Sequence, residues 1–363
     1  MNRIHRLRRT ALVALAVPMV LLMSACSTPG PTQPSMPGFA ELPPKEKSEL
    51  TPQLAAAADT LNKMAALQDR LYRVAAPLLI DNAELCKANA RNLLGFTAKN
   101  RYAYPGEYNQ AAHVAFGMDE RLQVTGVLAG SGAARAGLRA GDGLIAAGGK
   151  PLPTGPNALS GAGAVFGPLI AKHANLPMTI EREGSNRDMN IPVTRACAFQ
   201  IELGNADNVN SYADDRRVMV TRGMIGFTRN DDELAFVLAK GMAHNILGHA
   251  TAQRSSATIG SIIDSLMSVR PDLSMLIGSG GIKATTPERD AAADRLSLYL
   301  LARAGYDIDD AAAFWKRLAT SYPATVLNGY TANHPAIATR VAAIEAGVAE
   351  IKGKRSAKKA LVP

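Results

Sequence analysis

A long uninterrupted apolar segment is missing from this chain of 363 residues. The first apolar run, residues 11–23, is shorter than the roughly 20 residues that a membrane-spanning helix needs. In the second, residues 257–281, charged side chains interrupt the pattern at Asp264, Arg270 and Asp272. These interruptions exclude a standard membrane span, and we expect residues 257–281 to form a helical flap instead.

The chain also lacks a basic face of the kind that binds nucleic acid. Its formal net charge is +9, but four arginines stand within the first nine residues. Another five basic residues, with no acid among them, lie in the tail from Lys352 to Pro363. The body between is formally neutral, which argues against nucleic acid as a partner. We expect the tail to be a solvated end, with contact to anionic lipid or envelope polymer as the alternative.

The N-terminus has the order of a secretory signal: a basic region, a short apolar core, small residues and then Cys26. The stretch Met23-Ser24-Ala25-Cys26 resembles the lipobox of a bacterial lipoprotein. That resemblance implies cleavage before Cys26, a lipid anchor on this residue, and, because Ser27 follows, an outer-membrane lipoprotein facing the periplasm. An uncleaved N-terminal anchor is the alternative. Residues 26–47 are rich in proline and serine, which predicts a flexible tether.

Cysteine is scarce, with three in the whole chain. If Cys26 carries lipid, Cys86 and Cys197 remain, and a periplasmic pair of this kind favours a disulfide. Two buried free thiols are the alternative. Residues 48–92 carry apolar side chains at helical spacing, which predicts a long helical brace with a break near Pro77.

Turn and strand signals alternate through the middle of the chain. Residues 122–127 suit a strand, residues 133–138 suit a short helix, and Gly141-Asp142-Gly143 supplies a tight turn into the next strand. The stretch from Leu122 to Lys150 resembles the PDZ domains of bacterial envelope proteases, which carry the pattern S-x-A-x-x-A-G-L-x-x-G-D-x-I. We therefore expect a PDZ-like domain over residues 93–195.

A PDZ resemblance implies that an extended peptide adds to a sheet edge while backbone amides hold its carboxylate. The residues expected to form that loop are Leu94, Gly95 and Phe96. The alternative is a domain that acts only as a spacer or a brace.

The segment from Leu238 to His249 has the spacing of an H-E-x-x-H helix, in which two histidines bind zinc and a glutamate activates water. Here that motif reads Lys240-Gly241-Met242-Ala243-His244. Together with residues 291–307 and 333–345, it resembles the HtpX/BepA/Oma-type zinc metallopeptidases, metallopeptidase family forty-eight. The resemblance covers about residues 211 to 346 and implies a strand, the motif helix, a helix with E-A-D, and an H-P pair.

The same resemblance implies that the E of E-A-D is the third zinc ligand. Aligning Asp294 with the D of that motif puts Ala292 at the ligand position. Neither an ammonium nor a methyl group can donate a lone pair to zinc, so His244 is the single expected ligand and no cofactor is favoured. Gly241 removes the general base and is expected to let another segment approach closely. His249 points about 140° away around the helix and is a poor replacement.

Several of these side chains have two interpretations. Lys240 either reaches solvent along the helix surface, which we favour, or pairs with Asp294 in place of the metal charge. We expect His244 to be a hydrogen-bonded core histidine. His334 and Arg340 resemble positions that line the family's cleft, and a helix start with an exposed basic residue is the alternative.

The sequence therefore predicts an α+β fold: an N-terminal helix and a PDZ-like β-barrel or sandwich, followed by a mainly helical zincin-like peptidase domain. The expected parts are a signal at 1–25, a tether at 26–47, a helical brace at 48–92, a PDZ-like domain at 93–195, a degenerate metallopeptidase-like domain at 196–350 and a basic tail at 351–363.

The favoured function is that of an inactive metallopeptidase-like protein of the cell envelope, which binds peptides or envelope proteins through the PDZ-like domain and the empty cleft. The edge of a strand at 218–220 is expected to pair with an extended chain. An active zinc endopeptidase in envelope protein quality control is the alternative, and a structural assembly factor is a third hypothesis. The oligomeric state stays open.

Overall fold

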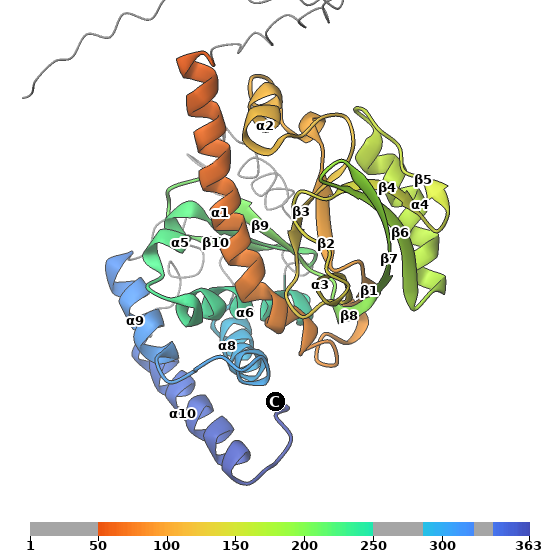
Figure 1. Ribbon diagram of the computed structural model, residues 1–363. Helices are drawn as coiled ribbons and strands as arrows, with labels where there is room; N and C mark the ends of the chain where they lie inside the picture. Colours follow the sequence, from red (N-terminus) through yellow and green to blue (C-terminus); the bar gives the residue numbers. More distant parts are fainter. Residues whose placement is uncertain (1–49, 250–285, 323–336) are drawn as a thin grey trace, which may run out of the picture. The chain divides into compact units, whose positions relative to one another are not determined.

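The computed structural model describes residues 50–249, 286–322 and 337–363 (Figure 1). The predicted lipid attachment at Cys26, the flap at 257–281 and the cleft residue His334 lie outside these ranges. Within them, sheets and helices are mixed, in agreement with the expected α+β class.

Helices and strands alternate in the first half of the chain, and helices dominate the second half. The helices are α1 (Pro52–Ile80), α2 (Tyr108–Phe116), α3 (Gly132–Arg135), α4 (Ala158–Lys172), α5 (Arg222–Phe227), α6 (Asp231–Ile246), α8 (Pro287–Arg303), α9 (Ala311–Ser321) and α10 (Ile337–Ser356). The strands are β1 (Ala90–Leu93), β2 (Phe96–Lys99), β3 (Gln123–Val127), β4 (Gly143–Ala147), β5 (Lys150–Pro151), β6 (Asn175–Arg182), β7 (Ser185–Pro192), β8 (Thr194–Cys197), β9 (Gln200–Gly204), β10 (Ser211–Ala213) and β11 (Arg217–Thr221).

Helix α1 lies in the segment predicted to be a helical brace, and the residues at its start explain where it begins. The Thr51 hydroxyl accepts a hydrogen bond from the backbone N–H of Leu54, and Pro52 opens the helix, where its missing N–H costs nothing. The predicted break near Pro77 is wrong, because the helix continues to Ile80. Tertiary packing explains this continuity, since both Val74 and Leu78 on this turn are almost fully buried.

The segment predicted to be PDZ-like forms a sheet in the order β2-β3-β4-β6-β7, with β5 paired to β4. Strands β3 and β4 fall where the sequence predicted them, and a buried apolar cluster joins the sheet to α4. Helix α4 was not predicted, because three glycines and Pro168 mask its pattern. The ring of its Phe166 packs edge-to-face on that of Phe96 in β2, with the ring centroids 6.1 Å apart.

The predicted disulfide between Cys86 and Cys197 is confirmed. Both residues are fully buried, and their Cα atoms lie 5.6 Å apart. The bond ties the turn after α1 to β8, and β8 in turn pairs antiparallel with β1. The two strands at the ends of the segment predicted to be PDZ-like are therefore paired with each other, and the disulfide joins them to the turn after α1.

A second sheet has the order β10-β11-β9. Strand β11 is central, antiparallel to β10 and parallel to β9. The expectation that the strand at 218–220 offers a free edge is therefore wrong, since both of its edges are paired. On β9, the side chain of Gln68 from α1 donates to the carbonyl of Ile201 and accepts from the N–H of Leu203, so it takes the place of a neighbouring strand.

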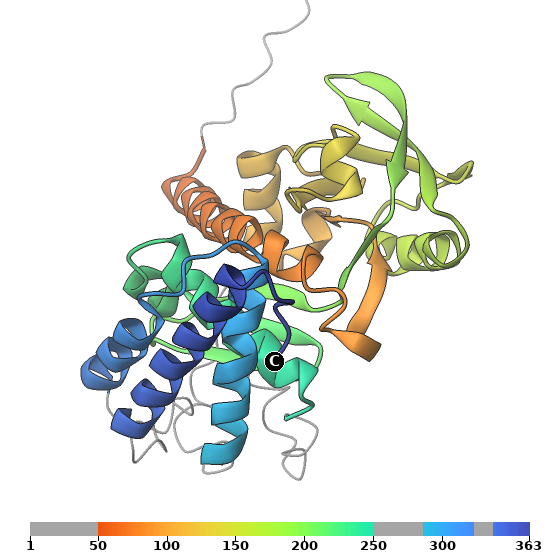
Figure 2. The ribbon, with the colours of Figure 1, turned by 90° about the horizontal axis from the view of Figure 1, so that it is seen from below.

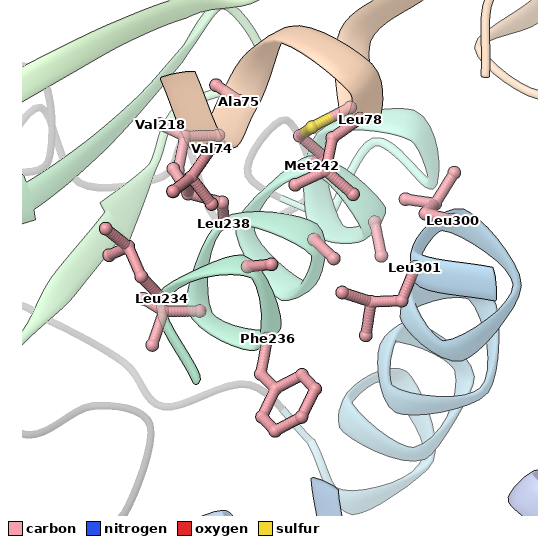
Figure 3. Close-up of a cluster of buried hydrophobic side chains, with 14 of the residues drawn as sticks. Val74, Ala75, Leu78, Val218, Leu234, Phe236, Leu238, Met242, Leu300 and Leu301 are labelled. Carbon is pink, nitrogen blue, oxygen red and sulfur yellow. The ribbon is translucent and has the colours of Figure 1, made fainter. Parts of the chain in front are cut away.

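Helix α6 lies at the centre of the main core. Figure 3 shows its Leu234, Leu238 and Met242 among side chains of α1, β11 and α8, such as Val218 of β11 and Leu301 of α8. A helix buried on all sides carries little amphipathic signal. Helix α10 packs along α8 and α9 (Figure 2). Across the described ranges, every helix is too short or too polar to cross a membrane.

The basic tail differs from the expected solvated end. Helix α10 continues to Ser356, and Leu361 packs against the main core. The ammonium of Lys354 donates to the carbonyl of Val362, and that of Lys352 pairs with Asp309. These contacts hold the C-terminal residues against the body of the protein.

Candidate functional site

The motif helix places Lys240 and His244 on one face, four residues apart. Its start is fixed by the Asn230 side chain, which accepts a hydrogen bond from the N–H of Glu233, and by three acidic residues in the first turn. Thirteen consecutive residues from Glu233 to Asn245 are buried. The helix is therefore a core element whose polar side chains must find partners inside the protein.

Lys240 is completely buried, with an exposed fraction of 0%. Its ammonium lies 2.7 Å from Oδ2 of Asp290 and 2.6 Å from Oδ1 of Asp294. The favoured expectation that it reaches solvent is therefore wrong, and the alternative pairing with Asp294 is what the structure contains. Two contacts this short to carboxylate oxygens are typical of hydrogen bonds from a charged ammonium group.

Both carboxylates come from helix α8. Thr286 caps this helix and Pro287 opens it, and Asp290 and Asp294 then follow one turn apart on the buried side. Ala292, the position aligned with the third zinc ligand, is exposed. Asp290 instead faces His244, with Oδ1 3.6 Å from Nε2. Asp290 was not among the predicted site residues, although its four-residue spacing from Asp294 places the two on one helix face.

A second cation closes the cluster from α10. Arg340 is 8% exposed, and its guanidinium grips Asp294 through Nε at 2.6 Å and Nη2 at 2.9 Å. Its Nε also lies 3.4 Å from Oδ2 of Asp290. The ring of Trp315 from α9 lies 4.5 Å from this guanidinium and 5.3 Å from the Lys240 ammonium. The resemblance had placed Arg340 beside a cleft, and the structure brings it to Asp294.

We call Lys240, Asp290, Asp294 and Arg340 the charge cluster. It contains two cations and two anions, so its formal charge is zero, which makes burial of all four tolerable. Burial lowers the pKa of Lys240, and the Arg340 charge lowers it further, while Asp294 and Asp290 oppose both effects. The cluster therefore joins α6, α8 and α10 through side-chain charges.

His249 does not point away from His244. Helix α6 ends at Ile246, and Gly248 then adopts a φ of +65°, which turns the chain back. The Nδ1 atoms of the two histidines are 2.9 Å apart. Burial lowers the pKa of both side chains. For His249, burial and then the neighbouring His244 lower the pKa to about 4. Neutral rings suit this contact, because one nitrogen donates and the other accepts.

Strand β11 packs against Gly241, the position at which the family motif has its glutamate. A Cβ atom on Gly241 would come within 2.6 Å of Cγ1 of Val218. Any larger side chain here must displace Val218, which is itself fully buried. The expected close approach of another segment at Gly241 is thus what the structure contains.

A groove of about 520 Å³ lies between α8 and α10 and reaches the charge cluster. Asp290, Asp294 and Arg340 line one end, and Arg295 and Glu350 line the other. Mostly aliphatic side chains lie between these ends. This groove is an opening that leads from the surface towards the charge cluster.

The residues do not fit a bound zinc ion. The ammonium of Lys240 stands between the carboxylates that a cation would use, and it repels a second cation. Across the described residues, histidine, cysteine and acidic side chains form no group of three that could hold a metal ion. His334 lies outside the described ranges. We therefore derive no hydrolytic step.

The loop expected to bind a peptide carboxylate lies between β1 and β2. Gly95 has a φ of +77°, and a Cβ atom there would come within 2.6 Å of the Ser131 side chain. The carbonyl of Gly95 accepts from the N–H of Leu128 and from the Ser131 hydroxyl. Strand β2 follows this loop and lies at one edge of its sheet. The predicted residues Leu94, Gly95 and Phe96 are thus together at a sheet edge.

A family model described as peptidase family M48 matches residues 172–348. No curated protein matches the chain. The match includes the motif helix and every member of the charge cluster, and it supports the M48 family and a metallopeptidase-like function for this region.

Proposed function

We propose that this chain is a metallopeptidase-like protein of the cell envelope that binds peptides or envelope proteins without cutting them. The observation that carries the proposal is the Lys240 ammonium, which contacts Asp290 and Asp294 at 2.7 and 2.6 Å. Because it fills the position of the first metal ligand, zinc has neither room nor enough donors there. Val218 also excludes a glutamate from position 241.

The proposed binding surface is the edge of β2. An extended peptide would add to this strand, and the amides around Gly95 would hold its terminal carboxylate. The positive φ of Gly95 and the two hydrogen bonds to its carbonyl give the loop a fixed conformation, which supports such a role. The apolar ring of Phe96 lies beside this loop and suits an apolar terminal side chain.

The envelope location is part of the proposal and rests on the N-terminal sequence. Lipidation of Cys26 and residence in the outer membrane are tested by mass spectrometry of the membrane-bound chain. A Cys26→Ser variant should stay unprocessed and lose the acyl groups. A wild-type chain that keeps residues 1–25 would instead support an uncleaved anchor.

An active zinc endopeptidase is the second candidate function, and the M48 match favours it. Metal analysis and casein cleavage decide between the two. The proposal expects neither stoichiometric zinc nor cleavage from the wild type. Zinc at one equivalent together with cleavage, both lost in His244→Ala, would establish the peptidase and refute the proposal.

Peptide binding is tested with a library of immobilised carboxyl-terminal peptides and their amidated copies. The free carboxylates should be retained and the amidated peptides released. Gly95→Val should abolish retention, because valine strains the positive φ and meets Ser131. Gly184→Ala is the matched control, since Gly184 has a φ of +72° with no neighbouring atom within 4 Å. Equal retention by the Gly95→Val chain would contradict this binding surface.

A further inference from the structure

We infer that Thr194 of β8 is a positioning residue for the loop at Gly95, and that its hydroxyl group sets how tightly this loop holds a peptide carboxylate. The inference rests on the proposed function, which assigns the carboxylate to this loop. It adds a residue from the opposite end of the segment 93–195, and with it a connection between the two ends of that segment.

Thr194 lies beside the entry to the loop. Strand β8 pairs antiparallel with β1, and in this register Thr194 is opposite Leu93, the last residue of β1. Leu94 and Gly95 follow directly in the chain. Thr194 is buried, with 6% of the residue exposed. Its backbone therefore fixes the point at which the chain enters the loop.

The Thr194 hydroxyl also reaches the start of α3. It accepts a hydrogen bond of 2.8 Å from the backbone N–H of Gly132, the first residue of this helix. A side chain does not fit at Gly132, because its Cβ atom would overlap the carbonyl oxygen of Pro192 in β7. The start of α3 is thus held by β7 and by the Thr194 hydroxyl together.

The start of α3 in turn holds the loop. Ser131 caps α3 with its hydroxyl, which also donates to the carbonyl of Gly95 at 3.3 Å. The same carbonyl accepts from the N–H of Leu128 at 2.9 Å, and the carbonyl of Leu128 accepts from the N–H of Ser131 at 3.1 Å. Both donors to Gly95 therefore come from residues 128–131, and the next residue along is the one that Thr194 binds.

Removal of the hydroxyl should loosen the loop while the strand pairing stays. Thr194→Val keeps the branched shape that suits a strand, and it leaves the N–H of buried Gly132 without its acceptor. An N–H in this position has to find another acceptor, which moves the start of α3 and Ser131 with it. A loop that must be ordered when the peptide binds costs affinity. We therefore expect the dissociation constant of a free-carboxylate peptide to rise about tenfold.

The test compares the full-length wild type with Thr194→Val and Thr194→Ser. The probe is a free-carboxylate peptide that the wild type retains from the immobilised library, and its dissociation constant is measured in solution by fluorescence anisotropy. Hydrogen exchange of the Leu128 amide, which donates to Gly95, reports on the loop without any peptide. Thr194→Val should weaken binding and speed this exchange. Thr194→Ser keeps the hydroxyl and should behave as the wild type.

Thr179→Val is the control. The Thr179 hydroxyl donates to Asp188 at 2.7 Å on the exposed side of the same segment, so its removal should change neither the affinity nor the exchange. Ser131→Ala breaks the connection to Gly95 at a second point and leaves β8 untouched. It should weaken binding as Thr194→Val does, and it decides the question if Thr194→Val does not fold.

Circular dichroism confirms that each variant is folded under the conditions of measurement. Unchanged peptide affinity or unchanged Leu128 exchange in the folded variants would overturn the inference, because Thr194 would then support the fold alone. A wild type that binds no free-carboxylate peptide would instead overturn the proposed function. The exchange of Leu128 would still test whether Thr194 positions the loop, so the two failures are distinct.

Discussion

Two buried ion clusters in this chain hold a carboxylate in different ways. In the segment of residues 93–195, Asp142 accepts from the backbone N–H of Arg139 at 2.8 Å and from two guanidinium nitrogens of Arg182 at 2.6 Å each. In the charge cluster, Asp294 is held by the side chains of Lys240 and Arg340. The first cluster locks a local turn to a neighbouring strand, and the second joins three helices.

This difference predicts that substitutions in the two clusters lower the free energy of unfolding by different amounts. A carboxylate with a backbone donor keeps part of its stabilisation when a side-chain partner is lost. A fully buried cluster of side-chain charges has no such reserve, because removing one charge leaves another uncompensated. The following variants test this contrast from the largest expected effect to the smallest.

Lys240→Met should lower the free energy of unfolding by about 3 to 5 kcal/mol, because it leaves the charge cluster with an uncompensated buried carboxylate. Denaturant unfolding measures the change. Lys63→Met is the matched control, since Lys63 is exposed and pairs with Asp59 on the surface of α1. It should cost less than about 1 kcal/mol. Equal effects of the two substitutions would contradict the buried pairing of Lys240.

Asp142→Asn should lower the unfolding free energy by about 2 kcal/mol at neutral pH, since it weakens the charge-assisted bonds but keeps an oxygen for Arg139. Burial opposes ionisation of Asp142, but Arg182 and the Arg139 N–H outweigh it and lower the pKa of this carboxyl.

A lowered folded pKa means that the contribution of Asp142 is present above 3.8, its ordinary value, and is lost as the pH falls below it. The difference between wild type and Asp142→Asn should shrink over that range. The exposed Asp119→Asn is the control. A difference that grows on acidification would contradict the pairing.

Gly241→Ala should lower the unfolding free energy by about 1 to 2 kcal/mol, because the new methyl group meets Val218 and this outweighs the gain in helix propensity. Gly163→Ala is the matched control, a helical glycine of α4 with no atom within 4 Å. It should stabilise the protein slightly. Stabilisation by both substitutions would show that position 241 has room for a side chain.

His249→Ala should have the smallest effect, about 1 kcal/mol, through loss of the contact with His244. Burial lowers the pKa of His249 from 6.5 to about 4, so the unfolded chain binds more protons between these values. The wild type should therefore lose stability as the pH falls from 6.5 to about 4, and His249→Ala should lose less. Parallel pH profiles of the two proteins would contradict the burial of His249.

Local signals in the sequence predicted much of the fold. Strands β3 and β4 follow from turn glycines and alternating apolar residues, and the disulfide follows from two cysteines left after Cys26. Helix α4 was missed because its glycines resemble a loop. The central place of β11 could not be predicted, because β9 pairs with it in parallel although β10 stands between them in the sequence.

The site was predicted in part. The sequence shows directly that Lys240 and Gly241 replace the first histidine and the glutamate of the H-E-x-x-H pattern. It also predicts that both lie on one helix with His244. The burial of Lys240 could not be predicted, because it depends on two carboxylates of α8 that lie 50 and 54 positions further along the chain. His249 was misplaced because the helix geometry was extended past the turn at Gly248.

The central claim is that Lys240 takes the place of a metal ligand and closes this cleft to zinc. Crystals of the wild-type protein grown in excess zinc, with anomalous diffraction recorded at the zinc edge, test it most directly. The account predicts no anomalous peak at the cluster and density for the Lys240 ammonium between Asp290 and Asp294. An anomalous peak bonded to His244 and Asp290, with Lys240 turned aside, would contradict it.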